Sequence, residues 1–263
     1  MQGIWNEPIS YFMFMRFTSQ KYAQAFINSG SIKFGTPNSW VEYAKQPGKR
    51  GDKKEGTLAS VAENEAYNIA ELNRLYGGDG AIVQHRDDGR ILFKNKRHMD
   101  LPGFCFYMLK DKIENDEMTQ DVSGKMFTDF TLNKTKEDIS KLPDGDKPAV
   151  IMINRHDLFL KRLEAALIDI GVKKDEIYFD QIKYFDMDRG KVDGYRPLLE
   201  LFCKDISYSY QTEGRIIVDT KDMKVLKRLK NPIYLGNLSG IADVNDWYFP
   251  DGIQAIVKAT ENR

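Results

Sequence analysis

The amino-acid sequence predicts an α+β protein with a mainly antiparallel, mixed sheet and flanking helices. Strand-like runs outnumber helix-like runs, and few of them form the strand–helix–strand units that parallel sheets require. Two short apolar runs flank the turn-forming residues 87–89, as in a hairpin. No repeat, linker or shift in composition divides the chain, so we expect a single domain over residues 1–263. The charged stretch 110–146 is expected to be a surface excursion from this domain.

The fold is expected to begin with a strand, a helix and a second strand. Residues 11–17 form an apolar and aromatic run, and the Thr-Ser pair after it suits a helix start. Within residues 20–29 apolar side chains recur four positions apart, and Gly30 follows where a left-handed helix cap is needed. A short strand over residues 31–35 comes next, and the Thr-Pro-Asn-Ser sequence at 36–39 then breaks the chain.

The remaining elements are predicted from the same kinds of pattern. Glycine and charge dominate residues 46–56, which predicts an exposed loop, and the apolar spacing in residues 57–76 predicts a helix. The most regular helix pattern covers residues 158–170. Short apolar runs predict further strands, and these runs are residues 81–85, 91–94, 104–109, 149–154, 177–185, 208–219, 233–235 and 253–258.

The composition argues against several classes of protein. Thirty-nine basic residues balance 39 acidic ones, so the chain lacks the bulk positive charge of a nucleic-acid coating protein. The longest apolar stretches are far shorter than the roughly 20 residues that span a bilayer, and the first residues do not resemble a secretory signal. We therefore expect a cytoplasmic protein without a membrane segment. The two cysteines and three histidines lack metal-ligand spacing, so we expect neither a disulfide framework nor a metal site.

The late strand carries the most informative polar residues. Side chains two positions apart on a strand point to the same side, so Gln211, Glu213 and Arg215 are expected to share one face. Tyr210 is expected on the opposite face. A solvent-facing strand of an antiparallel sheet has the same pattern, so a purely structural interpretation stays open.

A second candidate feature lies at the predicted start of the first helix. Arg16 stands just before Thr18 and Ser19, and a guanidinium beside free backbone amides attracts a phosphate. An arginine that extends its side chain along an edge strand would give the same sequence.

The charged loop supplies a third set of candidates. Arg50, Asp52 and Glu55 are available there to contact a substrate or a partner, although charges in such loops often pair with one another. Aromatic rings that could stack on a ligand near these segments are Phe34, Trp40, Tyr208 and Tyr210.

Several of these motifs resemble known families. An arginine on the first strand, a second strand reading Ser-Ile-Lys-Phe-Gly and a late Gln-x-Glu strand resemble the ADP-ribosyltransferase fold, in its Arg, Ser-Thr-Ser, Glu branch. The chain is also similar to a group of bacterial and phage proteins with an early Met-Arg-Phe strand, an Arg-x-Asp-x-x-Glu-Gly loop and a late Tyr-x-Tyr-Gln-x-Glu-x-Arg-Ile strand. This second resemblance covers most of the chain. The group is linked to mobile elements and phage conflict, so the resemblance implies a toxin or a phage-defence protein, but it implies no particular activity.

The first resemblance implies a mono-ADP-ribosyltransferase or another NAD-consuming enzyme, with NAD as its substrate. Arg16 would match the arginine that binds the NAD phosphates, Glu213 the catalytic glutamate and Gln211 the residue that orients the acceptor. The acceptor would be a nucleotide, a protein or a nucleic acid. The middle Ser-Thr-Ser strand of this branch has no counterpart in the chain. Further residues expected on the NAD side are Thr18, Ser19, Tyr210 and Arg215.

Two other functions stay open at this point. Without turnover, the same surface would serve a phage or host-defence protein that binds a partner protein or a nucleotide. A metal-dependent nuclease or other hydrolase would use Asp52, Glu55 and Glu213, although their spacing is not that of a metal-ligand motif.

Overall fold

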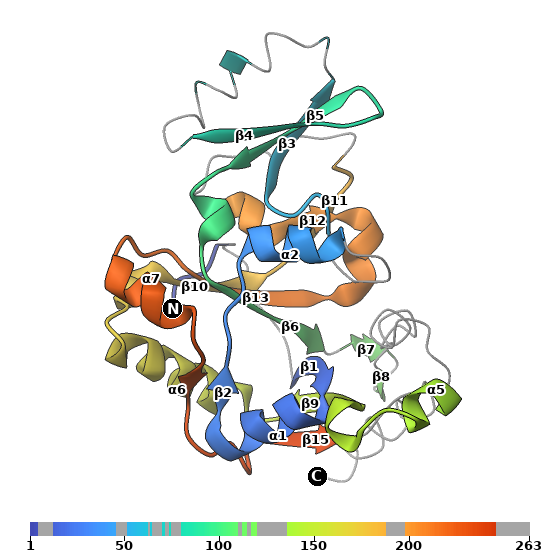
Figure 1. Cartoon of the computed structure of the whole chain (residues 1–263), viewed down its shortest axis with the longest axis vertical. Coiled ribbons are helices and arrows are strands. Elements are labelled where there is room, and N and C mark those ends of the chain that lie inside the picture. Colours follow the sequence, from blue (N-terminus) through green and yellow to red (C-terminus); the bar gives the residue numbers. More distant parts are fainter. Residues whose placement is uncertain are drawn as a thin grey trace.

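A six-stranded antiparallel sheet forms the centre of the molecule (Figure 1). The computed structural model describes residues 1–4, 13–45, 52–62, 64, 70–71, 74, 80–109, 112–114, 117–119, 136–187 and 198–245. Every neighbouring pair in the sheet is antiparallel, which confirms the expected α+β class with a mainly antiparallel sheet. Its strands, in spatial order, are β10 (Ile177–Gln181), β13 (Glu213–Val218), β6 (Gly103–Leu109), β1 (Met13–Ser19), β9 (Pro148–Ile153) and β15 (Ala242–Asn245).

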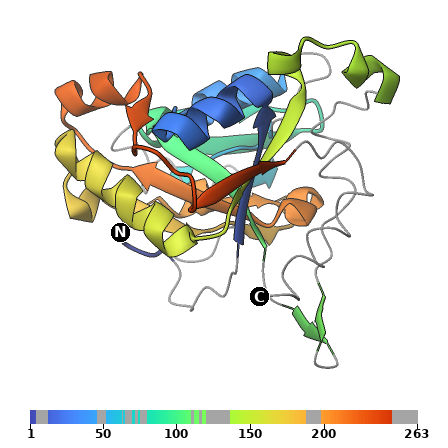
Figure 2. The same cartoon turned by 90° about the horizontal axis from the view of Figure 1, so that it is seen from below.

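Three helices cover one face of this sheet and enclose the largest core. They are α1 (Gln20–Ser29), α6 (His156–Asp169) and α7 (Met223–Leu229). Figure 2 shows α1 and α6 next to the strands. Successive side chains of a strand point to opposite faces of the sheet, and β1 shows this alternation. Phe14 joins the core under the helices, whereas Met13 and Met15 join a separate cluster on the other face.

The opposite face carries smaller elements that build the pocket described below. A three-stranded antiparallel sheet stands at one end of the molecule, with α2 (Pro37–Ala44) between it and the large sheet (Figure 1). Its strands are β3 (Thr57–Ala62), β5 (Arg90–Asn95) and β4 (Ala81–His85). Other elements are β11 (Lys183–Phe185), parallel to β12 (Cys203–Asp205); the pair β2 (Ser31–Ile32) and β14 (Ile233–Tyr234); the pair β7 (Lys112–Glu114) and β8 (Glu117–Thr119); α5 (Lys136–Ser140); and the short helices η2 (His98–Asp100), η3 (Asp144–Asp146), η4 (Lys174–Glu176), η5 (Leu199–Phe202) and η6 (Ile206–Gln211).

Several predicted elements are confirmed. The first helix covers residues 20–29 as expected, and Gly30 ends it with a left-handed φ of 63°. The hairpin around 87–89 forms between β4 and β5. The strands expected at 104–109 and 149–154 and the helix expected at 158–170 differ from the observed elements only at their ends.

Other predictions are wrong, and each has a physical reason. The helix expected over 57–76 is wrong for residues 57–62, which form the strand β3, because pairing with β5 buries Ala59 and Val61 on alternate positions. Farther along this range, the described residues 70, 71 and 74 are helical. The Thr-Pro-Asn-Ser sequence does not break the chain but starts α2. Thr36 caps this helix through a hydrogen bond from the Ser39 amide at 3.1 Å, and Pro37 suits the first turn.

The late strand was also expected to be longer than it is. Residues 206–211 form the 3-10 helix η6, and β13 begins only at Glu213. All six residues of β13 are buried, so the alternative of a solvent-facing strand is wrong. The predicted strand 253–258 and residues 11–12 of the first predicted strand lie outside the described residues. No helix in the described part of the chain is long and apolar enough to cross a membrane.

Candidate functional site

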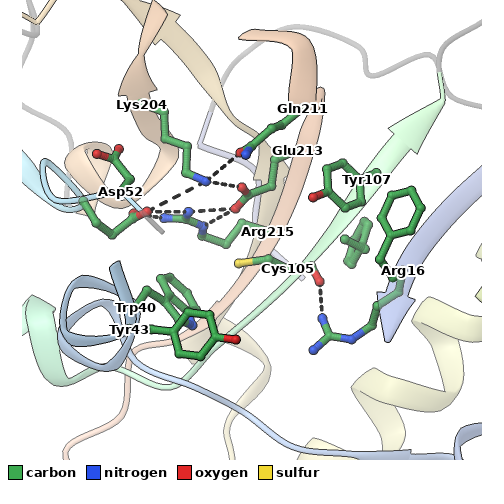
Figure 3. Close-up of a pocket in the computed structure, with 13 residues that line it drawn as sticks. Arg16, Trp40, Tyr43, Asp52, Cys105, Tyr107, Lys204, Gln211, Glu213 and Arg215 are labelled. Carbon is green, nitrogen blue, oxygen red and sulfur yellow. Dashed lines mark hydrogen bonds and ion pairs between the residues drawn. The ribbon is translucent and has the colours of Figure 1, made fainter. Parts of the chain in front are cut away.

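A pocket of about 310 Å³ opens beside the large sheet (Figure 3). Its walls come from segments that are far apart in the sequence. The lining residues are Arg16 and Phe17 of β1; Trp40 and Tyr43 of α2; Asp52 and Glu55 of the turn before β3; Cys105, Phe106 and Tyr107 of β6; Lys204 of β12; Gln211 at the end of η6; and Glu213 and Arg215 of β13.

The pocket lies where the sheet divides. The pairing of β1 with β6 ends at Met15 and Tyr107, after which β1 continues along β9 while β6 continues along β13. The Arg16 guanidinium reaches across this division, donates to the carbonyl oxygen of Cys105 and lies 4.3 Å from the centre of the Phe104 ring. Arg16 therefore holds a positive charge at one end of the pocket.

Arg215 is the centre of a buried ion network. Its side chain is fully buried, and its guanidinium donates to both carboxylate oxygens of Glu55 at 2.5 and 3.2 Å. It also donates to Glu213 Oε1 at 2.7 Å and to the Leu201 carbonyl oxygen at 2.5 Å. A forked guanidinium is suited to such a bidentate contact. The network explains how a charged side chain can occupy the centre of a sheet.

Lys204 completes this network from strand β12, which belongs to the small sheet with β11. Its ammonium donates to Glu213 Oε2 and to Gln211 Oε1, the latter at 3.1 Å, and lies 4.0 Å from Glu55. Burial alone would raise the pKa of Glu213, but the charges and hydrogen bonds of Lys204 and Arg215 lower this pKa to about 2. Glu213 is therefore a carboxylate at any physiological pH.

Asp52 differs from the other carboxylates of the pocket. Only 3% of its surface is exposed, and its Oδ1 accepts a hydrogen bond from the Lys54 amide at 2.7 Å. Within the described part of the chain, its Oδ2 is buried and has no hydrogen-bond partner. Burial, together with the negative charge of Glu55, raises the pKa of Asp52 to about 6.

The backbone before β13 brings Gln211 to the same place. Thr212 adopts a left-handed φ of 40°, which is unusual for a β-branched residue, and it links η6 to β13. The Glu213 amide then donates to the Tyr184 hydroxyl at 2.9 Å. Gln211 therefore reaches the pocket through a turn, and not through the strand alternation that predicted its position.

Trp40 forms an aromatic wall between two glycines. A Cβ atom on Gly35 or on Gly103 would come within 2.6 Å of the Trp40 ring, so only glycine permits this close approach at both positions. The ring also lies 4.7 Å from the Arg215 guanidinium, within the range of a cation–π contact.

The structure brings together seven of the residues predicted from the sequence, namely Arg16, Trp40, Asp52, Glu55, Gln211, Glu213 and Arg215. The buried positions of Asp52 and Glu55 correct the expectation that they belong to an exposed loop, since Glu55 pairs with Arg215 of the sheet and not within its own loop. Arg50 lies outside the described residues.

Five predicted residues do not line the pocket: Thr18, Ser19, Phe34, Tyr208 and Tyr210. Ser19 precedes α1 without a side-chain capping bond, and Tyr210 packs against the cluster that contains Met13 and Met15. The helix start therefore does not share the pocket with Arg16 as the sequence suggested.

Sequence reasoning missed Lys204 and Tyr43. The one available signal for Lys204 is its place directly after the apolar run that ends at Cys203, where a lysine needs a buried partner. No signal distinguished Tyr43 from the other tyrosines.

Comparisons of the chain with protein-family models, curated proteins and solved structures found no match. In the described part of the chain, no group of three or more His, Cys, Asp or Glu side chains is placed to hold a metal ion.

Proposed function

We propose that this chain is an NAD-consuming enzyme, either a mono-ADP-ribosyltransferase or an NAD glycohydrolase, in which Glu213 stabilises the reacting ribose and Arg16 binds the pyrophosphate. The observation that carries the proposal is the placement of Glu213, a buried and ionised carboxylate on the wall of a pocket that has a guanidinium at one end. The ADP-ribosyltransferase-like fold suggested by the sequence motifs is part of the same proposal.

The chemistry of the reaction needs such a carboxylate. Breaking the bond between nicotinamide and ribose develops positive charge on the ribose, as in glycoside hydrolysis. A fixed negative charge in a site that excludes water stabilises this transition state more than it stabilises the ground state. The pKa of about 2 keeps Glu213 charged without any change in protonation during the reaction.

The other walls suit the rest of a dinucleotide. A guanidinium is a preferred partner for phosphate oxygens, and Arg16 presents one at the division of the sheet. Trp40 and Tyr43 provide aromatic rings from α2 for stacking against a base or nicotinamide. The pocket volume of about 310 Å³ is at the lower end of the range for small-molecule sites.

A second candidate is a binding protein without turnover, and one observation favours it. Both oxygens of Glu213 already accept hydrogen bonds, Oε1 from Arg215 and Oε2 from Lys204. If these contacts persist with a ligand bound, the charge of Glu213 is neutralised by Arg215 and Lys204 and does not act on the ligand. The pocket would then bind a nucleotide or a partner protein without a reaction.

Release of nicotinamide separates the two candidates. Purified protein is incubated with NAD, with and without cell lysate as a source of acceptors, and nicotinamide is measured by mass spectrometry. We expect release by the wild type and none by Glu213→Gln, because this change removes the charge needed in the transition state. The matched control is Glu200→Gln, which alters a carboxylate that is equally buried but pairs with His98 outside the pocket.

Thermal shift with NAD completes this experiment. Retained stabilisation of Glu213→Gln by NAD would show that the variant is folded and binds substrate. Stabilisation of the wild type by NAD without nicotinamide release would reject the enzyme and support the binding protein.

A further inference from the structure

Asp52 is the one carboxylate of the pocket whose bonding is incomplete within the described residues. Glu55 and Glu213 have cationic partners for both of their oxygens, whereas Asp52 Oδ2 has no hydrogen-bond partner. A buried polar atom without a partner costs stability, so a protein retains one where a ligand or a reaction uses it. The proposed role of Glu213 leaves Asp52 without a function.

The position of Asp52 suggests which part of a reaction it would serve. Asp52 and Arg16 lie at opposite ends of the pocket, with Glu213 and Arg215 between them (Figure 3). If Arg16 holds the pyrophosphate and Glu213 the ribose, the Asp52 end is the side from which the acceptor meets the ribose.

We propose that Asp52 is the general base of the reaction and takes the proton of a neutral hydroxyl acceptor, either water or an alcohol, as that acceptor attacks C1′ of the ribose. This inference rests on the proposed function. It assigns the role of general base to a residue that the sequence placed among the substrate or partner contacts and, in the alternative of a metal-dependent hydrolase, among the residues that such an enzyme would use.

The step balances without any further reactant. The bond between C1′ and the pyridinium nitrogen breaks, and its electron pair leaves with neutral nicotinamide. A lone pair of the acceptor oxygen forms the new bond to C1′, and the proton of that hydroxyl passes to the Asp52 carboxylate. The positive charge of the pyridinium thus ends as a proton on Asp52, which solvent later removes.

The surroundings of Asp52 suit a base that works near neutral pH. Glu55 of the same turn adds to the effect of burial and raises the pKa, while Lys204 of β12 and Lys94 of β5 oppose this rise. Tyr208 of η6 also faces Asp52. The result, a pKa of about 6, leaves Asp52 mostly ionised at neutral pH but far more basic than Glu213.

The test is the pH dependence of single-turnover nicotinamide release between about pH 5 and 8. We expect the wild-type rate to fall as the pH decreases through about 6, where Asp52 gains a proton. Asp52→Asn should lower the rate at neutral pH by about 100-fold and remove this acid limb, while the Kd for NAD, measured by calorimetry, changes less than about threefold. The matched control is Asp180→Asn, which alters an equally buried aspartate that accepts from the Ile4 amide outside the pocket.

Each outcome separates this role from the proposed function. If the wild type releases nicotinamide and Asp52→Asn does so at a rate within about twofold of the wild-type rate, the role of Asp52 is rejected. The proposed enzyme is then unaffected. No release by the wild type at any pH rejects the proposed function, and the role of Asp52 with it. If Asp52→Asn does not fold, the wild-type profile decides, because a rate that is constant from about pH 5 to 7 is incompatible with this base.

Discussion

Loss of the ion pair between Glu55 and Arg215 should destabilise the protein strongly. In Glu55→Ala the fully buried Arg215 keeps Glu213 as its partner but loses a bidentate carboxylate. Removing one partner of a buried ion pair costs about 3–5 kcal/mol, because the remaining charge stays buried. Each kcal/mol lowers Tm by about 2–4 °C in a chain of roughly this size, so we expect Tm to fall by about 6–20 °C.

Thermal and urea unfolding of Glu55→Ala measure this loss, and Glu42→Ala is the control. Glu42 also pairs with a basic residue, Lys45, but its side chain is 67% exposed, so its loss should leave Tm nearly unchanged. The double variant Glu55→Ala with Arg215→Met should be more stable than the sum of the two single losses, since it leaves no unpaired guanidinium. A loss below about 1 kcal/mol in Glu55→Ala would refute the reasoning that this network holds the pocket together.

Three further predictions concern stability. The pKa of Asp52 rises from 3.8 to about 6 on folding, so the folded state binds the Asp52 proton more tightly than the unfolded state does. The stability gained from this proton is present below about pH 4 and is lost as the pH rises through 6. Asp52→Asn should therefore raise the free energy of unfolding by about 3 kcal/mol relative to wild type above pH 7 and by little near pH 4, as measured by urea titration; an equal effect at both pH values would contradict the raised pKa. Thr212→Gly should stabilise the protein by about 0.5–1 kcal/mol, because glycine tolerates a φ of 40°, and a lower Tm would show that the threonine side chain is needed there. Thr36→Ala should cost about 1 kcal/mol through loss of the α2 cap, whereas Thr36→Ser should restore most of the Tm.

Local patterns predicted the central elements of the fold because those patterns report directly on burial. The spacing of apolar residues in α1 and α6 and the apolar runs of β6 and β9 each match the face or strand that is buried. The segment 57–62 was mistaken for a helix because its strand forms only by pairing with β5, which lies about 30 residues later in the chain. The local sequence does not show this partner.

The pocket was predicted in part because several of its residues carry charge in otherwise apolar surroundings. Glu213 and Arg215 are two positions apart on one strand, and this spacing alone indicated that they share a face. The burial of Asp52 and Glu55 could not be predicted, because it depends on Arg215 and Lys204, which come about 150 residues later. The single-domain organisation over residues 1–263 stays a prediction.

The separation of Glu55 and Arg215 along the chain has a consequence for synthesis. These two residues are 160 positions apart, and Lys204 is also added late. At a translation rate of about 5–20 residues per second, about 8–32 s pass between the addition of Glu55 and that of Arg215. During this time the growing chain has neither the guanidinium that pairs with Glu55 nor Glu213, the glutamate on the wall of the pocket. The pocket, and with it the activity that we propose, would therefore be incomplete on the ribosome until the last third of the chain had emerged.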